Sequence, residues 1–345
     1  MIHIHFMKMR FGVDISIGTA NQFADFNVNQ QVEILESTVK KVEELGYDSI
    51  WIVDHFVPLR GKPNNNSVYE AWTTLTYLSS LTKKVKLGNI VLCNAYRNPA
   101  LLAKMTACLD VFSRGRFELG YGAGWADQDY DAYGYPFPKT RVRMEMMEEG
   151  IQIIRKMWTE EAPTFNGKHY SIKDAFCSPK PIQKPHPPIM IGGMGKKFTL
   201  RVVAKYADTS NFVIGNIQNV KILLDVLKQH CEDVSRKYND IRKSLYLTTV
   251  IGKTDKDVED IIKRNYGSID YFKSESLGGD ENLEDIQKDN FNGHLNGLVG
   301  TPDKIIQKLE ELAKLDVSFI INIFPEKDKI ESLTLFRDEV LPAFK

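Results

Sequence analysis

The sequence predicts a parallel α/β fold, and more specifically a (β/α)8 TIM barrel. Short apolar runs recur along the 345 residues, and each is followed by a longer amphipathic stretch. Several runs are continuous rather than alternating, which is typical of parallel strands covered on both faces. Eight runs match the barrel, and no G-x-G-x-x-G loop of a doubly wound sheet follows the first. We therefore expect one barrel domain over residues 1–345.

The expected strands follow one another at intervals that leave room for helices. They are Arg10–Ile15, Ser49–Val53, Leu87–Leu92, Phe117–Tyr121, Ile189–Ile191, Thr209–Val213, Leu245–Ile251 and Ser318–Ile323. From Val28 to Val42 the apolar residues step by three and four, so they share one helical face. Thr301 followed by Pro302 is typical of the cap and first residue of another helix.

Two connections are longer than an ordinary crossover requires. Segment 160–188, after the expected fourth strand, contains six prolines, and we expect it to be extended and packed over the barrel rim. Segment 268–292, after the seventh strand, is polar and rich in Gly and Asp, and we expect an insertion or lid. The prediction is a barrel with insertions after strands 4 and 7.

Composition limits the classes of partner. Lys+Arg and Asp+Glu are both 45, and the zero net charge argues against nucleic acid and anionic membrane surfaces. No apolar run approaches the ~20 residues of a membrane span. The four cysteines lack a C-x-x-C spacing and indicate reduced thiols in a cytoplasmic protein. With no net charge, any charged ligand must be met by a local site, and we expect a small-molecule substrate. No metal-binding motif is present.

The strand ends are the candidate positions for chemistry, because barrels of this type build their active sites there. Asp54 and His55 close the second expected strand, and a histidine beside a carboxylate can exchange a proton near neutral pH. Neighbouring residues on a strand point to opposite faces, so the two side chains need not touch. A histidine that only caps the strand is an equally supported alternative.

Glycines mark two further strand ends. Gly192–Gly195 comes after the fifth strand and before two lysines, where backbone amides can surround a phosphate; a tight turn is the alternative. Gly120–Gly124 lacks the dinucleotide spacing. We interpret it as a strand end stripped of side chains so that a flat ring can approach, with Trp125 on one side. Cys93, at the third strand end, lines the site or is a buried thiol.

Seven stretches, in this order, resemble the bacterial-luciferase-like superfamily of flavin- and deazaflavin-dependent oxidoreductases. They are Glu44–Trp51 before Asp54-His55, Leu87–Val91 before Tyr96–Pro99, Ser113–Phe117 before Gly122–Trp125, Tyr133–Pro138, Pro187–Gly193, Ala204–Asp208 and Val299–Pro302. The Gly-Ala-Gly-Trp and Tyr-Gly-x-Pro-Phe-Pro elements are most similar to the branch that uses the deazaflavin coenzyme F420.

The resemblance implies a role for each matching residue. It makes His55 the active-site histidine with Asp54 near the ring, and it places a non-proline cis peptide at Ile90-Val91 behind the ring. Residues that match ring-binding positions are Cys93 and Gln128, and those that match the loop holding the coenzyme tail are Ile191, Gly192, Gly193, Met194 and Gly195. Trp125 stands where relatives that oxidise glucose 6-phosphate carry a glutamate, which indicates a bulkier or more apolar substrate pocket.

The implied activity is hydride transfer between C5 of the deazaflavin and a small organic substrate, with His55 moving the proton. The alternatives are an FMN-dependent two-component monooxygenase of the same superfamily, a catalytically silent flavin or deazaflavin binder, and an unrelated phosphosugar barrel. Relatives are mostly homodimers joined through the helices after strands two and three. Segment Val68–Leu78 is apolar enough to allow a homodimer here.

Overall fold

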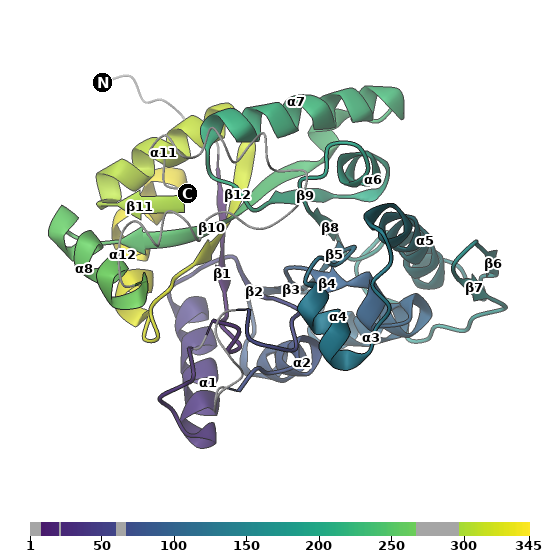
Figure 1. The fold of residues 1–345 in the computed structure, drawn as a ribbon, viewed down its shortest axis with the longest axis horizontal. Helices are drawn as coiled ribbons and strands as arrows, with labels where there is room; N and C mark the ends of the chain where they lie inside the picture. Colours follow the sequence, from purple (N-terminus) through teal and green to yellow (C-terminus); the bar gives the residue numbers. More distant parts are fainter. Residues whose placement is uncertain (1–7, 21, 60–66, 267–296) are drawn as a thin grey trace.

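A closed parallel barrel forms the centre of the structure, a computed structural model that describes residues 8–20, 22–59, 67–266 and 297–345. Within these residues eight strands form the ring (Figure 1): β1 (Arg10–Asp14), β2 (Ser49–Ile52), β3 (Lys86–Asn89), β5 (Phe117–Gly122), β8 (Ile189–Gly192), β9 (Thr209–Phe212), β10 (Arg242–Ile251) and β12 (Val317–Ile323). Strand β10 pairs with both β9 and β12, which closes the ring. The predicted TIM barrel is confirmed.

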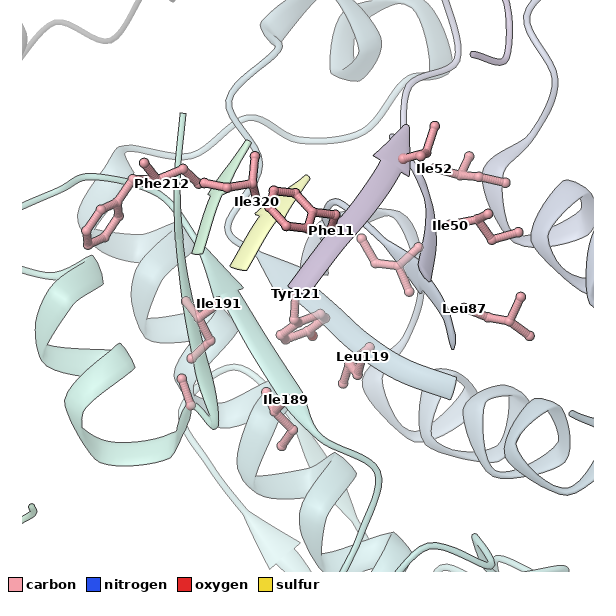
Figure 2. Packing of buried hydrophobic residues seen from close by; sticks show 14 of the residues in the cluster. Phe11, Ile50, Ile52, Leu87, Leu119, Tyr121, Ile189, Ile191, Phe212 and Ile320 are labelled. Carbon is pink, nitrogen blue, oxygen red and sulfur yellow. The ribbon is translucent and has the colours of Figure 1, made fainter. Parts of the chain in front are cut away.

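Helices surround this ring (Figure 1). In chain order they are α1 (Val28–Glu44), α2 (Ala71–Leu81), α3 (Pro99–Phe112), α4 (Asp127–Tyr133), α5 (Thr140–Thr159), α6 (Thr199–Tyr206), α7 (Ile217–Asp233), α8 (Asp255–Tyr266), α11 (Pro302–Lys314) and α12 (Ile330–Glu339). The outward side chains of successive strands are fully buried beneath them, from Phe11 on β1 to Ile320 on β12 (Figure 2). Burial on both faces explains why the strands read as continuous apolar runs.

The third strand differs from its prediction. Instead of one strand over Leu87–Leu92, β3 ends at Asn89 and a short β4 (Leu92–Cys93) pairs with β5. The peptide bond between Ile90 and Val91, in the gap, is cis, as the resemblance implied. A further strand that we did not predict, β11 (Gly297–Gly300), pairs in parallel with β10 outside the ring.

Segment 160–188 is not simply extended. It contains a hairpin of β6 (Phe165–Asn166) and β7 (Ser171–Ile172), whose loop is held by Glu149 of α5 through the amides of residues 168–170. Its proline-rich end is held by Asp110, which accepts hydrogen bonds from the amides of Ile182 and Gln183. Gln183 also reaches the first residue of β5, so the segment does pack at a rim, the N-terminal one. Segment 268–292 lies outside the described residues.

The barrel interior is filled by a cluster of large side chains around Trp51, and a charge pair closes its N-terminal end. Trp51 is fully buried inside, and a Cβ added at Gly12 would lie only 2.9 Å from its indole. At the N-terminal end Arg10 pairs with Glu118 at 2.9 Å and lies 4.5 Å above the ring of Phe319. The interior is therefore solid, and the space for a ligand lies at the C-terminal end.

Candidate active site

His55 is held by a carboxylate that follows a different strand, two places further around the ring. Its Nδ1 lies 2.6 Å from Oδ2 of Asp129, on helix α4 after β5. The second oxygen of Asp129 accepts the amides of Phe56 and Val57 at 2.9 and 3.1 Å. This arrangement fixes the imidazole and leaves Nε2 as the ring nitrogen able to exchange a proton with a ligand.

Electrostatics keep Asp129 charged although it is buried. Burial alone would raise the pKa of the carboxyl, but the hydrogen bonds from His55 and from the amides of Phe56 and Val57 outweigh it, so the pKa lies below its ordinary value. An ionised Asp129 stabilises a positive charge on the imidazole, which is the charge that His55 takes on when it accepts a proton.

Asp54 has partners of its own and does not bond to His55. Its two oxygens accept from the guanidinium of Arg97 at 2.8 and 3.0 Å, and one also accepts the amide of Cys93 at 2.9 Å. Arg97 in turn contacts Glu70. Since Asp54 is 4% exposed and paired on both oxygens, its contacts hold β4 and the bulge before it in place.

The thiol of Cys93 also points to a protein partner. Its Sγ lies 3.1 Å from the hydroxyl of Tyr130, which donates to the carbonyl of Ala123. Burial raises the pKa of Cys93 to about 11, so the thiol is protonated at neutral pH and is no nucleophile. Gly124 has a φ of +80°, and a Cβ there would collide with both side chains.

The glycines of β5 serve the protein chain itself. A Cβ at Gly122 would lie 2.5 Å from the side chain of Val91, and one at Gly192 would lie 3.0 Å from it. A Cβ at Gly120 would collide with the carbonyl of Asn89. The bare strand end that we interpreted as room for a flat ring is thus occupied by the Ile90-Val91 bulge. Half-buried Val91 presents the surface that such a ring can meet.

The loop after β8 has the properties of an anion site. Gly193 has a φ of +130° and donates its amide to the carbonyl of Asn211 at 3.1 Å. The amides of Met194 and Gly195 have no acceptor within the part of the chain that the structure describes. Lys196 and Lys197 follow as exposed cations. Half-buried backbone donors before a helix fit a phosphate-bearing tail.

Aromatic side chains line the mouth around His55. Trp125 is 56% exposed and meets the imidazole edge-on at 5.6 Å between ring centroids. Phe56 packs against Tyr96 at 4.5 Å and against Tyr133 at 4.3 Å. Gln128 lies exposed on α4, one residue before Asp129.

Sequence reasoning named Trp125 but missed Asp129 and the position of Phe56 among the tyrosines. The spacing offered only a weak signal, because α4 carries acids at 127, 129 and 131 and the pattern does not reveal which one turns inward. Across the described ranges, no helix is long and apolar enough to cross a bilayer. The same ranges hold no group of three or more His, Cys, Asp or Glu side chains suited to a metal ion.

A closed barrel with a paired histidine, a bulge and a glycine loop at its C-terminal mouth defines an enzyme site. Residues 9–318 match the family described as luciferase-like monooxygenase, and the chain belongs to this family. It is 25% identical to an F420-dependent glucose-6-phosphate dehydrogenase of Amycolatopsis mediterranei (strain U-32), over 91% of this chain and 94% of that protein.

Relatives with a different cofactor are also similar. An FMNH2-dependent dimethylsulfone monooxygenase of Pseudomonas putida is 26% identical over 80% of this chain and 79% of that protein. A solved F420-dependent secondary alcohol dehydrogenase, in complex with an F420–acetone adduct, has the same fold. Its TM-score is 0.77 at 20% identity, over 98% of this chain and all of that one.

Proposed function

We propose that this protein is an F420-dependent oxidoreductase that transfers a hydride between C5 of the deazaflavin and a small organic substrate. The observation that carries the proposal is the placement of the His55–Asp129 pair at the same barrel mouth as the cis Ile90-Val91 bulge and the Gly192–Gly195 loop. The F420-dependent relative that covers nearly the whole chain supports it.

The chain fits the coenzyme at two places. The amides of Met194 and Gly195 and the lysines after them suit the anionic tail, while Val91, supported by Gly122 and Gly192, suits one face of the ring. Through Cys93 and Arg97, Asp54 keeps the bulge in place. When bound, the deazaflavin supplies the hydride acceptor or donor, so the protein has to supply position and proton transfer.

His55 is the proton donor or acceptor in this proposal. In alcohol oxidation, Nε2 would take the proton of the substrate hydroxyl while the carbon that bears this hydroxyl loses its hydride, and in the reverse direction Nε2 would return that proton. Asp129 stabilises the resulting imidazolium through Nδ1. Trp125 packs edge-on against the imidazole, and its exposed face, together with Phe56, presents an apolar surface to the substrate.

A titration with F420 and FMN side by side tests the cofactor. We expect F420 to bind at least about tenfold more tightly than FMN, a difference of about 1.4 kcal/mol. The single-turnover measurement is the loss of the visible deazaflavin absorbance when a secondary alcohol is added to the F420-loaded protein.

The second candidate is an FMN-dependent monooxygenase, which the similarity to the dimethylsulfone enzyme favours. Tight FMN binding together with no measurable F420 binding would replace the first proposal by this one. Tight F420 binding without any hydride exchange, in the wild type as in His55→Ala, would indicate a catalytically silent binder. A homodimer joined through α2 and α3 remains part of the proposal, and a molar mass from light scattering tests it.

A further inference from the structure

Buried charged groups lie on the side of the mouth that faces the proposed coenzyme site. In the order of the ring, β1 lies opposite β8, which carries the glycine loop, and β10 lies opposite β3, which leads into the bulge. On this side Asp14 is the last residue of β1, and Tyr246 lies in the middle of β10. A substrate that stacks on the deazaflavin ring would therefore have β1 and β10 on its opposite side.

Asp14 points into the barrel at its C-terminal end, so it lies at the bottom of the mouth, which we call the floor. A Cβ added at Gly12, two residues earlier, would face the interior Trp51. Side chains two apart on a strand point to the same face, so Asp14 faces the interior as well. One oxygen of Asp14 accepts the hydroxyl of Tyr246 at 3.0 Å. Tyr246 and Val91 both pack against the same cluster of interior side chains around Trp51, so Asp14 is linked through Tyr246 to the cluster that also supports Val91.

The neighbouring charged groups do not cancel the negative charge of Asp14. Lys329, which is 4% exposed, donates to the hydroxyl of Ser16 at 2.9 Å and interacts electrostatically with both Asp14 and Glu326. Glu326 accepts from Ser332 at 2.5 Å, and within the described residues its second oxygen is buried without a hydrogen-bond partner. Two buried carboxyls thus share one buried lysine, while Arg264 acts on Glu326 only from an exposed position.

We infer that Asp14 is a specificity residue that makes this site select neutral, hydroxyl-bearing substrates over phosphorylated or carboxylated ones. The inference rests on the proposed function and names its substrate class. A carboxylate accepts a hydrogen bond from a hydroxyl group, and it repels a phosphate or carboxylate through a medium where charges are weakly screened. Exposed Trp125 and half-buried Phe56, on the histidine side, suit the apolar flank of such an alcohol.

Ionisation of Asp14 sets the pH at which this selection operates. Burial raises its pKa to about 6, and the attraction of Lys329 and the hydrogen bond from Tyr246 offset the burial only in part. The groups that act on it are Lys329, just before α12, and Tyr246 on β10, while Glu326 after β12 acts on Lys329 and β2 contributes the neutral Trp51. Selection is therefore strong above pH 6 and weak below it.

The test compares matched probes that differ by one anionic group. The pairs are cyclohexanol with 4-hydroxycyclohexanecarboxylate and glucose with glucose 6-phosphate, assayed as kcat/KM with F420 and as Kd by calorimetry on the F420-loaded protein. We expect the wild type to favour the neutral member of each pair by about 30-fold or more, and Asp14→Asn to reduce this ratio about tenfold. Asp127→Asn removes an exposed carboxylate from α4 and is the matched control, expected to leave the ratio unchanged.

Two further readouts separate specificity from a structural role. The carboxylate probe is almost fully charged between about pH 6 and 7.5, so the wild-type ratio should rise over that range while the ratio of Asp14→Asn stays flat. Lys329→Met, which removes the cation, should change the ratio in the opposite direction and gives an answer even where Asp14→Asn does not fold.

The outcomes are distinguishable. A wild type that binds F420 but prefers the anionic members, treats both alike or binds neither would overturn the inference, as would an Asp14→Asn variant with the wild-type ratio. Absence of F420 binding in the wild type would instead overturn the proposed function.

Discussion

The two ends of the barrel use ionisable residues in opposite ways. At the N-terminal end, Arg10 and Glu118 bond directly at 2.9 Å, and Lys243 reaches Asp316 at 2.7 Å, so each charge has a counter-charge. At the C-terminal end, Asp14 shares a lysine with Glu326, and His55 keeps one ring nitrogen away from its aspartate. The first arrangement stabilises the fold. In the second, His55 can exchange a proton with a ligand, and Asp14 can distinguish neutral from anionic substrates.

Removing the imidazole should have the largest effect of any change at either end. We expect His55→Ala to lower kcat by about 10²- to 10⁴-fold, because a positioned acid or base contributes that much. F420 affinity should stay within about threefold of the wild-type value, since the loop after β8 is unchanged. Single-turnover absorbance and a binding titration measure the two quantities. Turnover within threefold of the wild type would remove His55 from its role.

Neutralising the partner of His55 should have a smaller effect. Asp129→Asn keeps an acceptor for the amides of Phe56 and Val57 but loses the negative charge beside the imidazole. We expect kcat to fall about 10- to 100-fold with KM nearly constant. Asp131→Asn on the same helix, at an exposed position, is the control. Equal losses in the two variants would contradict the assignment.

The N-terminal end should respond in stability alone. Glu118→Gln leaves Arg10 without a charged partner, and we expect a loss of roughly 2–3 kcal/mol, at the lower end for a broken buried pair because a fifth of the Arg10 side chain is exposed. Denaturant unfolding measures the loss, and kcat should not change. Arg141→Ala at an exposed helical pair should cost less than about 0.5 kcal/mol.

Neutralising Asp14 at the C-terminal end should raise the stability at neutral pH, whereas neutralising Glu118 at the N-terminal end lowers it. The folded-state pKa of Asp14, about 6, lies above its ordinary value of 3.8, so its contribution favours folding below pH 4 and is lost as the pH rises through 6. Asp14→Asn should therefore exceed the wild type by on the order of 2 kcal/mol at pH 7.5 and match it below pH 4. Unfolding midpoints at the two pH values measure this, and a variant less stable at pH 7.5 would contradict it.

The sequence predicted the barrel because its strands are buried on both faces and leave unmistakable apolar runs. It also predicted that His55 and Gly192–Gly195 lie at the same end of the barrel, because both follow parallel strands. The break between β3 and β4 was missed by periodicity, because Ile90 and Val91 are as apolar as their neighbours, and only the resemblance indicated it. The glycines of β5 were assigned to a ligand, although the space beside them belongs to Val91.

Asp129 could not be predicted because its function depends on distance in space. Asp54 lies next to His55 in the sequence and was the natural candidate, yet its oxygens bond to Arg97 and Cys93, and an aspartate 74 positions away takes that place. The choice among the three acids of α4 depends on how the helix turns after Gly124, which packs against Tyr130 and Cys93. Long-range packing decides this, and local pattern does not contain it.

The origin of the Asp129 carboxylate also limits how this enzyme can be rebuilt. The imidazole stands on one loop and the acid that orients it stands on another, two strands further around the ring. A chimera that imports only the loop after β2 from a relative would separate a donor from its acceptor. Successful exchange of loops therefore requires the pair to be transplanted together.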